Sequence, residues 1–173
     1  MGSSGKKITV IGSSNVEFIM TMDHLPSVGE SVSAETYMQT FGGKGANQAV
    51  GAAGAGGDVR FVNCVGDDPL SEQMLQNFET VGIDTSSVWK ERETSSGVAL
   101  IMIGQAGANY LSVIPGANAR ITPERVDSVA DMIRESGIVL LQYEIPAETN
   151  ARVLEIAREA GVPVMWNFAP AKE

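Results

Sequence analysis

Short, almost wholly apolar segments alternate with segments of helical periodicity along most of this 173-residue chain. The apolar segments, which are typical of buried parallel strands, are 8–11, 59–65, 138–141 and 164–166. Apolar residues recur at intervals of three and four in the segments 70–81, 126–133 and 153–160. This alternation predicts an α/β fold with a doubly wound, mostly parallel sheet flanked by helices on both faces.

A second group of segments mixes polar and apolar positions and is joined by turns that contain Gly or Pro. These segments are 18–22, 32–41, 97–103 and 110–114. We expect them to be antiparallel strands of a small separate β-sheet. An exposed apolar face on such a sheet would be an aggregation hazard unless something covers it.

Two helix starts are indicated by a capping side chain followed by proline. Asp68-Pro69 and Thr122-Pro123 each place the cap before a proline at the first helical position. The adjacent Asp67 and Asp68 are therefore interpreted as caps in preference to a pair of catalytic carboxylates.

The segment 41–49, with the sequence FGGKGANQA, places a flexible turn at an expected helix N-terminus. The first N–H groups of a helix have no partner within it, so this loop is predicted to hold an oxygen-rich ligand. It is not a Walker A loop, because Met38 stands where that motif has Gly and Gly45 where it has Ser or Thr. No dinucleotide-binding glycine pattern follows the first strand, which argues against a nicotinamide cofactor.

Charge and composition narrow the classes of partner. A net charge of −9 and a pI near 4.6 argue against nucleic acid and against an anionic membrane surface. The single cysteine, Cys64, excludes an internal disulfide, and no apolar run reaches the ~18 residues of a spanning helix. A cytoplasmic protein fits these features best. Residues 1–6 read as an expression leader or a frayed tail, so the domain is expected to begin at residue 7.

Two isolated residues were considered as reactive or metal-binding groups. His24 has no Cys or second His nearby and is expected to be a turn histidine, so no metal site is predicted. Cys64 closes an apolar strand without a basic neighbour in the sequence, and we expect an inert buried thiol.

The glycine string resembles the first signature of the ribokinase-like, or PfkB, family of sugar kinases, in its GGKGANQA form. Other segments match the family in order and with family-like spacing: 12–15, 26–30, 64–68, 96–101, 115–119, 142–146 and 167–171. The resemblance covers essentially the whole chain. It implies that residues 7–173 form the N-terminal part of such a domain, with lid strands near 17–41 and 97–114. The lid would cover a sugar site and form a homodimer contact.

Sugar hydroxyls both donate and accept hydrogen bonds, so a sugar pocket needs carboxylates and amides beside apolar surface. The resemblance implies these substrate-binding residues: Asn15, Glu17, Gly43, Lys44, Asn47, Ala99, Ile101 and Glu144. Taken singly, Asn15 could satisfy a turn, Lys44 could be a solvated loop charge, and Glu144 could begin a helix. Their joint occurrence in one matched framework favours the sugar site.

Two positions depart from the family pattern. The family has Asn-x-Asp after the first strand, whereas this chain has Asn15-Val16-Glu17, with a carboxylate one methylene longer. A small displacement in a hydroxyl-binding pocket weakens binding considerably, so three interpretations of Glu17 are open: it alters affinity, it selects a different sugar, or it was introduced to perturb binding. Phe168 stands where the family usually has Pro, and the neighbouring Trp166 is expected to repack that corner.

The family's second signature, D-T-x-G-A-G-D, is absent from this sequence. That signature supplies the general-base Asp, so no catalytic residue is assigned here and the chain alone is expected to be inactive. The resemblance also places the ATP pocket, the Mg contacts and a monovalent-cation loop beyond residue 173.

The complete enzyme would use Mg-ATP to phosphorylate D-ribose, or a similar pentose, at its 5-hydroxyl. The alternative is a non-catalytic module that binds sugar or dimerises.

Overall fold

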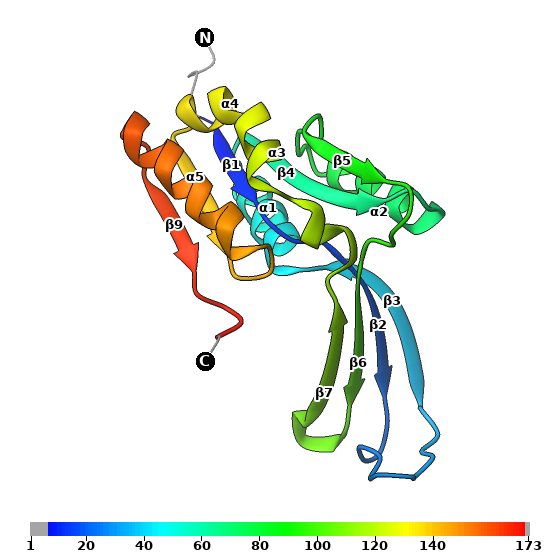
Figure 1. Ribbon diagram of the computed structural model, residues 1–173. Coiled ribbons are helices and arrows are strands. Elements are labelled where there is room, and N and C mark those ends of the chain that lie inside the picture. The colour runs from blue at the N-terminus through cyan, green and yellow to red at the C-terminus, as the bar shows by residue number, and fades with distance from the viewer. Residues whose placement is uncertain (1–6, 172–173) are drawn as a thin grey trace.

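A computed structural model describes residues 7–171, in which a β-sheet lid projects from an α/β body (Figure 1). The predicted leader, residues 1–6, lies outside the described residues. The body contains a parallel sheet with the strand order β5-β4-β1-β8-β9. Its strands are β1 (Ile8–Ile11), β4 (Val59–Gly66), β5 (Val88–Glu91), β8 (Ile138–Gln142) and β9 (Val164–Asn167).

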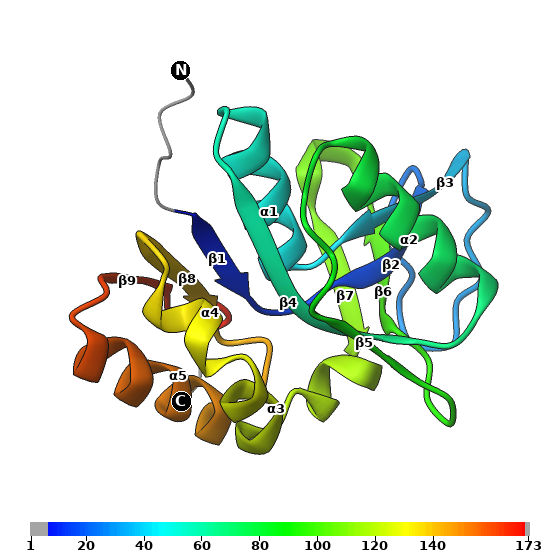
Figure 2. The ribbon, with the colours of Figure 1, turned by 90° about the horizontal axis from the view of Figure 1, so that it is seen from above.

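Helices cover both faces of this sheet, as Figure 2 shows. One face carries α1 (Lys44–Gly54) and α2 (Pro69–Thr80), and its core centres on Phe61, Met74 and Phe78. The other face carries α3 (Pro123–Ser128), α4 (Ala130–Arg134) and α5 (Ala147–Ala160). Two short 3₁₀ helices, η1 (Gln105–Gly107) and η2 (Gly116–Arg120), complete the helical elements of the described chain. The predicted doubly wound sheet is confirmed.

The strand order reverses direction at β1. The chain runs outward from β1 through β4 to β5, then returns to the other side of β1 for β8 and β9. Ligands of open α/β sheets bind beyond the carboxyl ends of the strands at such a switch point. The ends of β1 and β8 therefore mark the expected position of a site.

The lid contains β2 (Asn15–Thr21), β3 (Thr36–Gly42), β6 (Gly97–Ile103) and β7 (Asn109–Ile114) in the order β3-β2-β6-β7. The prediction of a purely antiparallel sheet was wrong. The pairs β2–β3 and β6–β7 are antiparallel, but β2 and β6 are parallel. Only strands joined by a short connection must reverse direction, and a long stretch of body elements separates β2 from β6.

Two body elements differ from the sequence pattern. The apolar periodicity over 126–133 predicted one helix, whereas the structure has α3 and α4 with a break at Val129. The Ser128 hydroxyl donates to the carbonyl of Arg125 at 2.6 Å, and such bonds compete with helix continuation. The short edge strand β5 was not anticipated. Among residues 7–171, no helix is long and apolar enough to cross a membrane.

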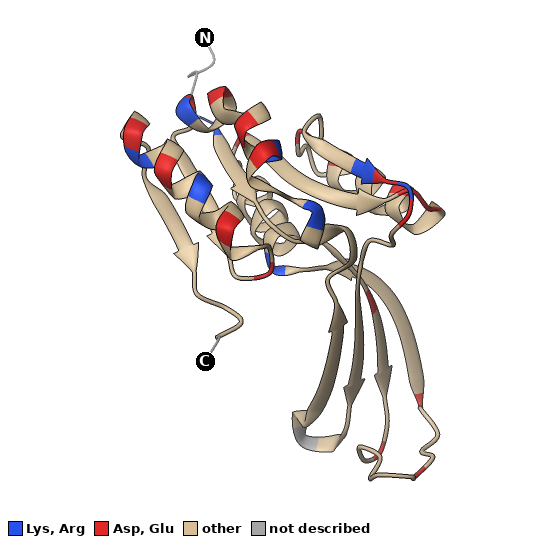
Figure 3. Ribbon diagram, viewed as in Figure 1, with Lys and Arg blue, Asp and Glu red and all other residues tan. Residues whose placement is uncertain are grey.

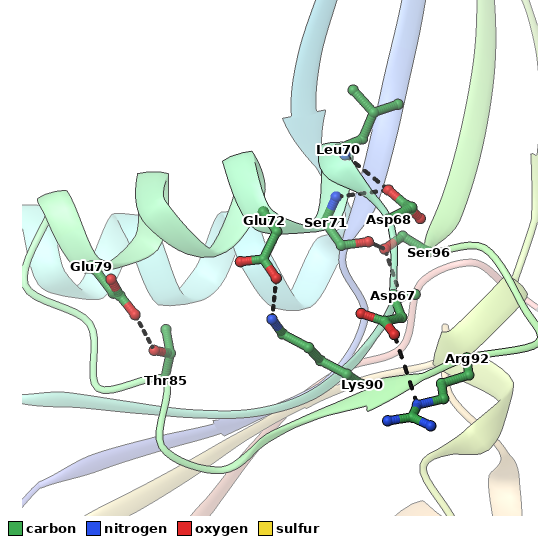
Figure 4. Close-up of polar contacts among 11 residues, drawn as sticks. Asp67, Asp68, Leu70, Ser71, Glu72, Glu79, Thr85, Lys90, Arg92 and Ser96 are labelled. Atoms are coloured by element: carbon green, nitrogen blue, oxygen red, sulfur yellow. Dashed lines mark hydrogen bonds and ion pairs between the residues drawn. The ribbon is translucent and has the colours of Figure 1, made fainter.

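The two aspartates before α2 have different roles (Figure 4). The Asp68 carboxylate accepts hydrogen bonds from the N–H groups of Leu70 and Ser71, both at 2.9 Å, and is the predicted N-cap. Asp67 makes no cap. It faces Arg92 at 4.0 Å, and both side chains are largely exposed. The interpretation of both aspartates as caps was thus right for Asp68 only. Thr122 caps α3, as predicted, through a 3.4 Å bond from the N–H of Arg125.

Alanine substitutions should distinguish the contributions of these two aspartates to stability. We expect Asp68→Ala to lower the free energy of unfolding by about 1 kcal/mol, because two N–H groups of α2 lose their acceptor. The matched variant Asp67→Ala should change it by less than about 0.5 kcal/mol, since an exposed ion pair contributes little. Urea unfolding followed by circular dichroism measures both values. Equal losses in the two variants would contradict the assignment.

Candidate functional site

A cavity of about 540 Å³ lies at the carboxyl ends of β1 and β8, where the lid meets the body. It is lined by Asn15, Lys44, Leu111, Val113, Pro115, Asn118, Ala119, Tyr143, Glu144, Ile145, Pro146 and Pro170. The lining combines one carboxylate, one ammonium and two amides with aliphatic and ring surface. Such a combination suits a small ligand that carries both hydroxyl groups and C–H faces.

Three of the predicted site residues line this cavity: Asn15, Lys44 and Glu144. Gly43, the N-cap of α1, immediately precedes Lys44. The remaining predicted residues do not reach the lining. Asn47 lies on α1 and is exposed.

Ala99 and Ile101 lie on the lid near the cavity wall. They pair in register with Val113 and Leu111, which do line the cavity. Because paired residues share one face of a sheet, Ala99 and Ile101 lie on the face that is directed to the cavity, but on β6, the strand next to the cavity-lining β7. The alternation of residues within the predicted strand 110–114 could have indicated Leu111 and Val113 as cavity-lining residues.

Gly43 allows α1 to begin close to the loop after β1. Its φ is 91°, and a Cβ at this position would lie 2.8 Å from the Cα of Ser14. Any other residue would be strained there and would push the helix away. The glycine is therefore needed for a close approach of backbone to backbone.

The first N–H groups of α1 are occupied by the chain itself. Lys44 N–H donates to Glu144 Oε2 at 2.8 Å, and Gly45 N–H donates to Ser13 Oγ at 3.2 Å. Ala46 N–H donates to the Ser13 carbonyl at 2.8 Å. The loop was predicted to hold an oxygen-rich ligand, and in this structure the oxygens come from Ser13 and Glu144. A carboxylate at this position is favoured by the helix dipole.

Glu144 is held by both of its oxygens. Lys44 Nζ donates to Oε1 at 2.8 Å, and the Ser13 hydroxyl donates to Oε2 at 2.6 Å. Burial of the carboxyl raises its pKa, but hydrogen bonds from the Lys44 side chain, Ser13 and the Lys44 backbone outweigh that effect. The pKa of Glu144 is consequently lowered from its ordinary value of 4.5. Glu144 is thus a charged anchor for Lys44 and the start of α1.

Glu17 also contacts the glycine turn. Its Oε1 accepts a hydrogen bond from Gly43 N–H at 3.3 Å, and Glu17 itself is half-buried. Glu17 is not part of the cavity lining. Its longer side chain is directed to the backbone of the loop that precedes α1, which gives the departure from the family pattern a structural consequence.

An aromatic cluster borders the cavity through Tyr143. The ring centroids of Tyr143 and Trp166 lie 4.8 Å apart, and those of Trp166 and Phe168 lie 4.7 Å apart in a stacked arrangement. The expected repacking of this corner by Trp166 and Phe168 is therefore present. Tyr143 belongs to a segment that the family resemblance covered, but no role had been assigned to it.

Two residues considered for other chemistry lie elsewhere. His24, in the loop after β2, contacts Glu30 Oε1 at 2.8 Å. Cys64 is buried, but the prediction that it lacks a basic neighbour was wrong, because Arg125 Nη1 donates to its Sγ at 3.1 Å. Burial raises the pKa of the thiol and outweighs the opposing effect of Arg125, so its thiolate is disfavoured. Over the described part of the chain, no group of three or more His, Cys, Asp or Glu could hold a metal ion.

Glu144 should make folding stability depend on pH. The pKa of Glu144 is lower in the folded state than in the unfolded chain. The charged carboxylate therefore stabilises the fold at pH values above the unfolded-state pKa, and this stabilisation is lost as the pH falls through the folded-state pKa. We expect Glu144→Gln to remove this part of the acid sensitivity, so that its unfolding free energy falls less steeply than that of the wild type below pH 4.5.

Urea titrations at a series of pH values measure this difference. Glu159→Gln, at an exposed position of α5, is the matched control and should keep the wild-type slope. Parallel pH profiles for the wild type and Glu144→Gln would show that Glu144 contributes nothing to the pH dependence of the unfolding free energy.

Comparisons with known proteins agree with this fold. Deoxyribokinase of Salmonella typhi is 38% identical over 164 residues, which are 95% of this chain and 54% of the relative. Ribokinase of Staphylococcus aureus is 36% identical over 167 residues, which are 96% of this chain and 55% of the relative. The structure of Arabidopsis thaliana ribokinase complexed with ribose and ATP superposes with a TM-score of 0.85 at 32% identity. That match covers 95% of this chain and 54% of the plant protein.

This chain spans about half the length of the curated relatives it matches. The family model for pfkB family carbohydrate kinases matches residues 5–173, which is nearly all of the chain. This match, with a polar cavity at the switch point of the sheet, shows that the chain belongs to the pfkB family of carbohydrate kinases.

Proposed function

We propose that this chain is the sugar-binding part of a ribokinase-type kinase, which phosphorylates the 5-hydroxyl of D-ribose or a similar pentose with ATP. The observation that carries the proposal is the convergence of Asn15, Lys44 and Glu144 on one cavity at the β1–β8 switch point. Relatives named ribokinase and deoxyribokinase support a pentose as the substrate class.

The cavity offers different chemistry to different parts of a sugar. The amide of Asn15 and the ammonium of Lys44 can bind hydroxyl oxygens, while Leu111 and Val113 supply apolar surface for C–H groups. Glu144 positions Lys44 through the 2.8 Å ion pair. In this proposal the site binds and orients the sugar, and Asn47, Ala99 and Ile101 join it only if the lid and the body move closer together.

ATP and Mg²⁺ belong to the proposed reaction, and the sequence lacks the family signature that would hold the transferred phosphoryl group. No cluster of metal ligands occurs within residues 7–171. The proposal therefore assigns ATP, Mg²⁺, any monovalent cation and the general-base Asp to the portion of full-length relatives that this chain does not match. A cytoplasmic location is part of the same proposal, based on the acidic composition and the single cysteine.

Titration calorimetry with D-ribose tests the proposal on the 173-residue chain. We expect saturable heat from the wild type. Glu17→Ala should weaken binding roughly tenfold or more, because the glycine turn loses a charged hydrogen-bond acceptor. Glu17→Asp, which restores the family's carboxylate, should bind D-ribose at least as tightly as the wild type.

Glu79→Ala, in α2, is the matched control for loss of a carboxylate and should bind like the wild type. No heat from a folded wild-type sample, with D-ribose or 2-deoxy-D-ribose, would refute the proposed sugar site.

A module without kinase activity would bind sugar in the same way. An assay for ADP formation with ATP, Mg²⁺ and D-ribose tests where the catalytic groups lie. This chain alone is expected to give no turnover, since the family signature that supplies the general-base Asp is absent from its sequence. Turnover by the purified chain would overturn our assignment of the catalytic groups to the unmatched portion.

We also propose that the lid mediates a homodimer. Its face opposite the cavity carries exposed apolar side chains, including Tyr37, Leu100, Tyr110 and Ile114. Figure 3 shows few charged residues along the lid strands, in contrast to the helices of the body. An uncharged apolar sheet face of this kind is suited to packing on a second copy of itself.

Sedimentation measures this association. The wild type should sediment as a dimer, and Leu100→Glu should shift it to monomer because each protomer would bury an unpaired charge. Val28→Glu is the matched control, since Val28 is fully exposed in the loop before β3, and it should remain dimeric. A monomeric wild type, or a dimer that tolerates Leu100→Glu, would contradict the lid interface.

A further inference from the structure

A buried amide in the cavity wall, that of Asn118, has all of its polar side-chain atoms engaged. Asn118 is 2% exposed and lies in η2. Its Oδ1 accepts from Ser14 N–H at 2.9 Å, and its Nδ2 donates to the Ser14 carbonyl at 3.0 Å. The same Nδ2 donates to Asn15 Oδ1 at 3.0 Å. The family resemblance covers the segment 115–119, but it assigns no role to Asn118.

These contacts allow only one orientation of the Asn118 amide. The backbone of Ser14 presents a fixed donor and a fixed acceptor, so the amide oxygen must face the N–H and the amide nitrogen must face the carbonyl. A rotated amide would place like groups opposite each other at both positions. Ser14 is itself fixed from behind, because its hydroxyl donates to Asn63 Oδ1 at 2.7 Å and Asn63 Nδ2 donates to the Gly12 carbonyl at 2.7 Å.

The fixed Asn118 amide determines the orientation of Asn15 in turn. Since Asn118 presents N–H, Asn15 must present its oxygen to it, and its own Nδ2 is left for the cavity. Asn15 is only 4% exposed, and within residues 7–171 the side-chain hydrogen bond of Asn15 is the one that its Oδ1 accepts from Asn118. Gly97 leaves room for the pair, because a Cβ there would lie 2.1 Å from Asn15 Oδ1 and 2.3 Å from Asn118 Nδ2.

We propose that Asn118 is a positioning residue that holds the Asn15 amide with its N–H₂ group toward the cavity, so that this position selects a hydrogen-bond acceptor on the ligand. The inference rests on the proposed function for the identity of that ligand, a pentose. The selected group is then an oxygen of the sugar that accepts from Asn15, and a donor-only group at the same position would be rejected because two donors would face each other.

Exchange of side-chain amide protons with water, followed by NMR on the chain without ligand, tests the orientation. The signals of the two side-chain amide protons of Asn15 are identified by their absence from the spectrum of Asn15→Asp. In the wild type, the Asn15 protons should exchange rapidly and those of Asn118 slowly. In Asn118→Asp, a carboxylate replaces the inward donor, so the Asn15 amide should rotate and its protons should exchange at least about tenfold more slowly.

Two further variants test whether the change in exchange rate comes from destabilisation or misfolding of the protein. Asn118→Leu removes the constraint without burying a charge, and the Asn15 protons should remain unprotected. Asn150→Asp alters another buried amide, whose Nδ2 donates to the Gln142 carbonyl at 2.8 Å, and should leave Asn15 unchanged. Slow exchange of Asn15 in the wild type, or the same change in Asn150→Asp as in Asn118→Asp, would overturn the proposal.

Calorimetry with sugar analogues tests selectivity. D-ribose is compared with its monodeoxy and monodeoxyfluoro analogues, because fluorine can accept a hydrogen bond but cannot donate one. At one hydroxyl position, the deoxy analogue should bind about tenfold more weakly than D-ribose, and the fluoro analogue should recover part of that loss. Asn118→Asp should abolish the recovery.

The two levels of the proposal can fail separately. If the exchange results hold but no sugar binds, the amide orientation stands and the pentose assignment fails. If sugar binds and the fluoro analogue shows the same recovery in the wild type and in Asn118→Asp, the positioning role of Asn118 is refuted.

Discussion

The Glu144 carboxylate at the N-terminus of α1 is the interaction on which the candidate site depends. It joins three segments that are distant in sequence: the loop after β8, the start of α1, and Ser13 in the loop after β1. A half-buried carboxylate is costly unless it is compensated, and here an ammonium, a hydroxyl and a backbone N–H compensate it. The arrangement is therefore stable only when all three segments are in place.

The lid is tied to the body through the same region. The chain passes from β1 into β2 through Ser13 and Ser14, and Asn118 connects that passage to the end of β7. The cavity thus lies at a junction whose backbone is fixed by buried hydrogen bonds, while the lid strands extend away from it (Figure 1). Buried hydrogen bonds at this junction therefore hold the polar groups of the cavity wall in place.

Much of the site could be located from sequence because glycine and capping patterns have local causes. Gly43 is required where the backbone has positive φ, and Asp68 is required where the first N–H groups of α2 need an acceptor. The roles of polar side chains were less predictable. Asn47 was assigned to the site by resemblance but is exposed, and the contact between Glu17 and Gly43 depends on a pairing across two lid strands.

The sequence by itself determined the α/β class, the separate lid, most strand and helix positions and the region of the ligand site, because periodicity, glycine conformation and capping act over a few residues. Only the tertiary structure decided the parallel pairing of β2 with β6, the break between α3 and α4, and the edge strand β5. It also decided that Glu144 occupies the start of α1 and that Asn118 orients Asn15. Glu144 contacts Lys44, and Asn118 contacts Asn15, across about a hundred positions of sequence, and such partners come together only when the sheet has formed.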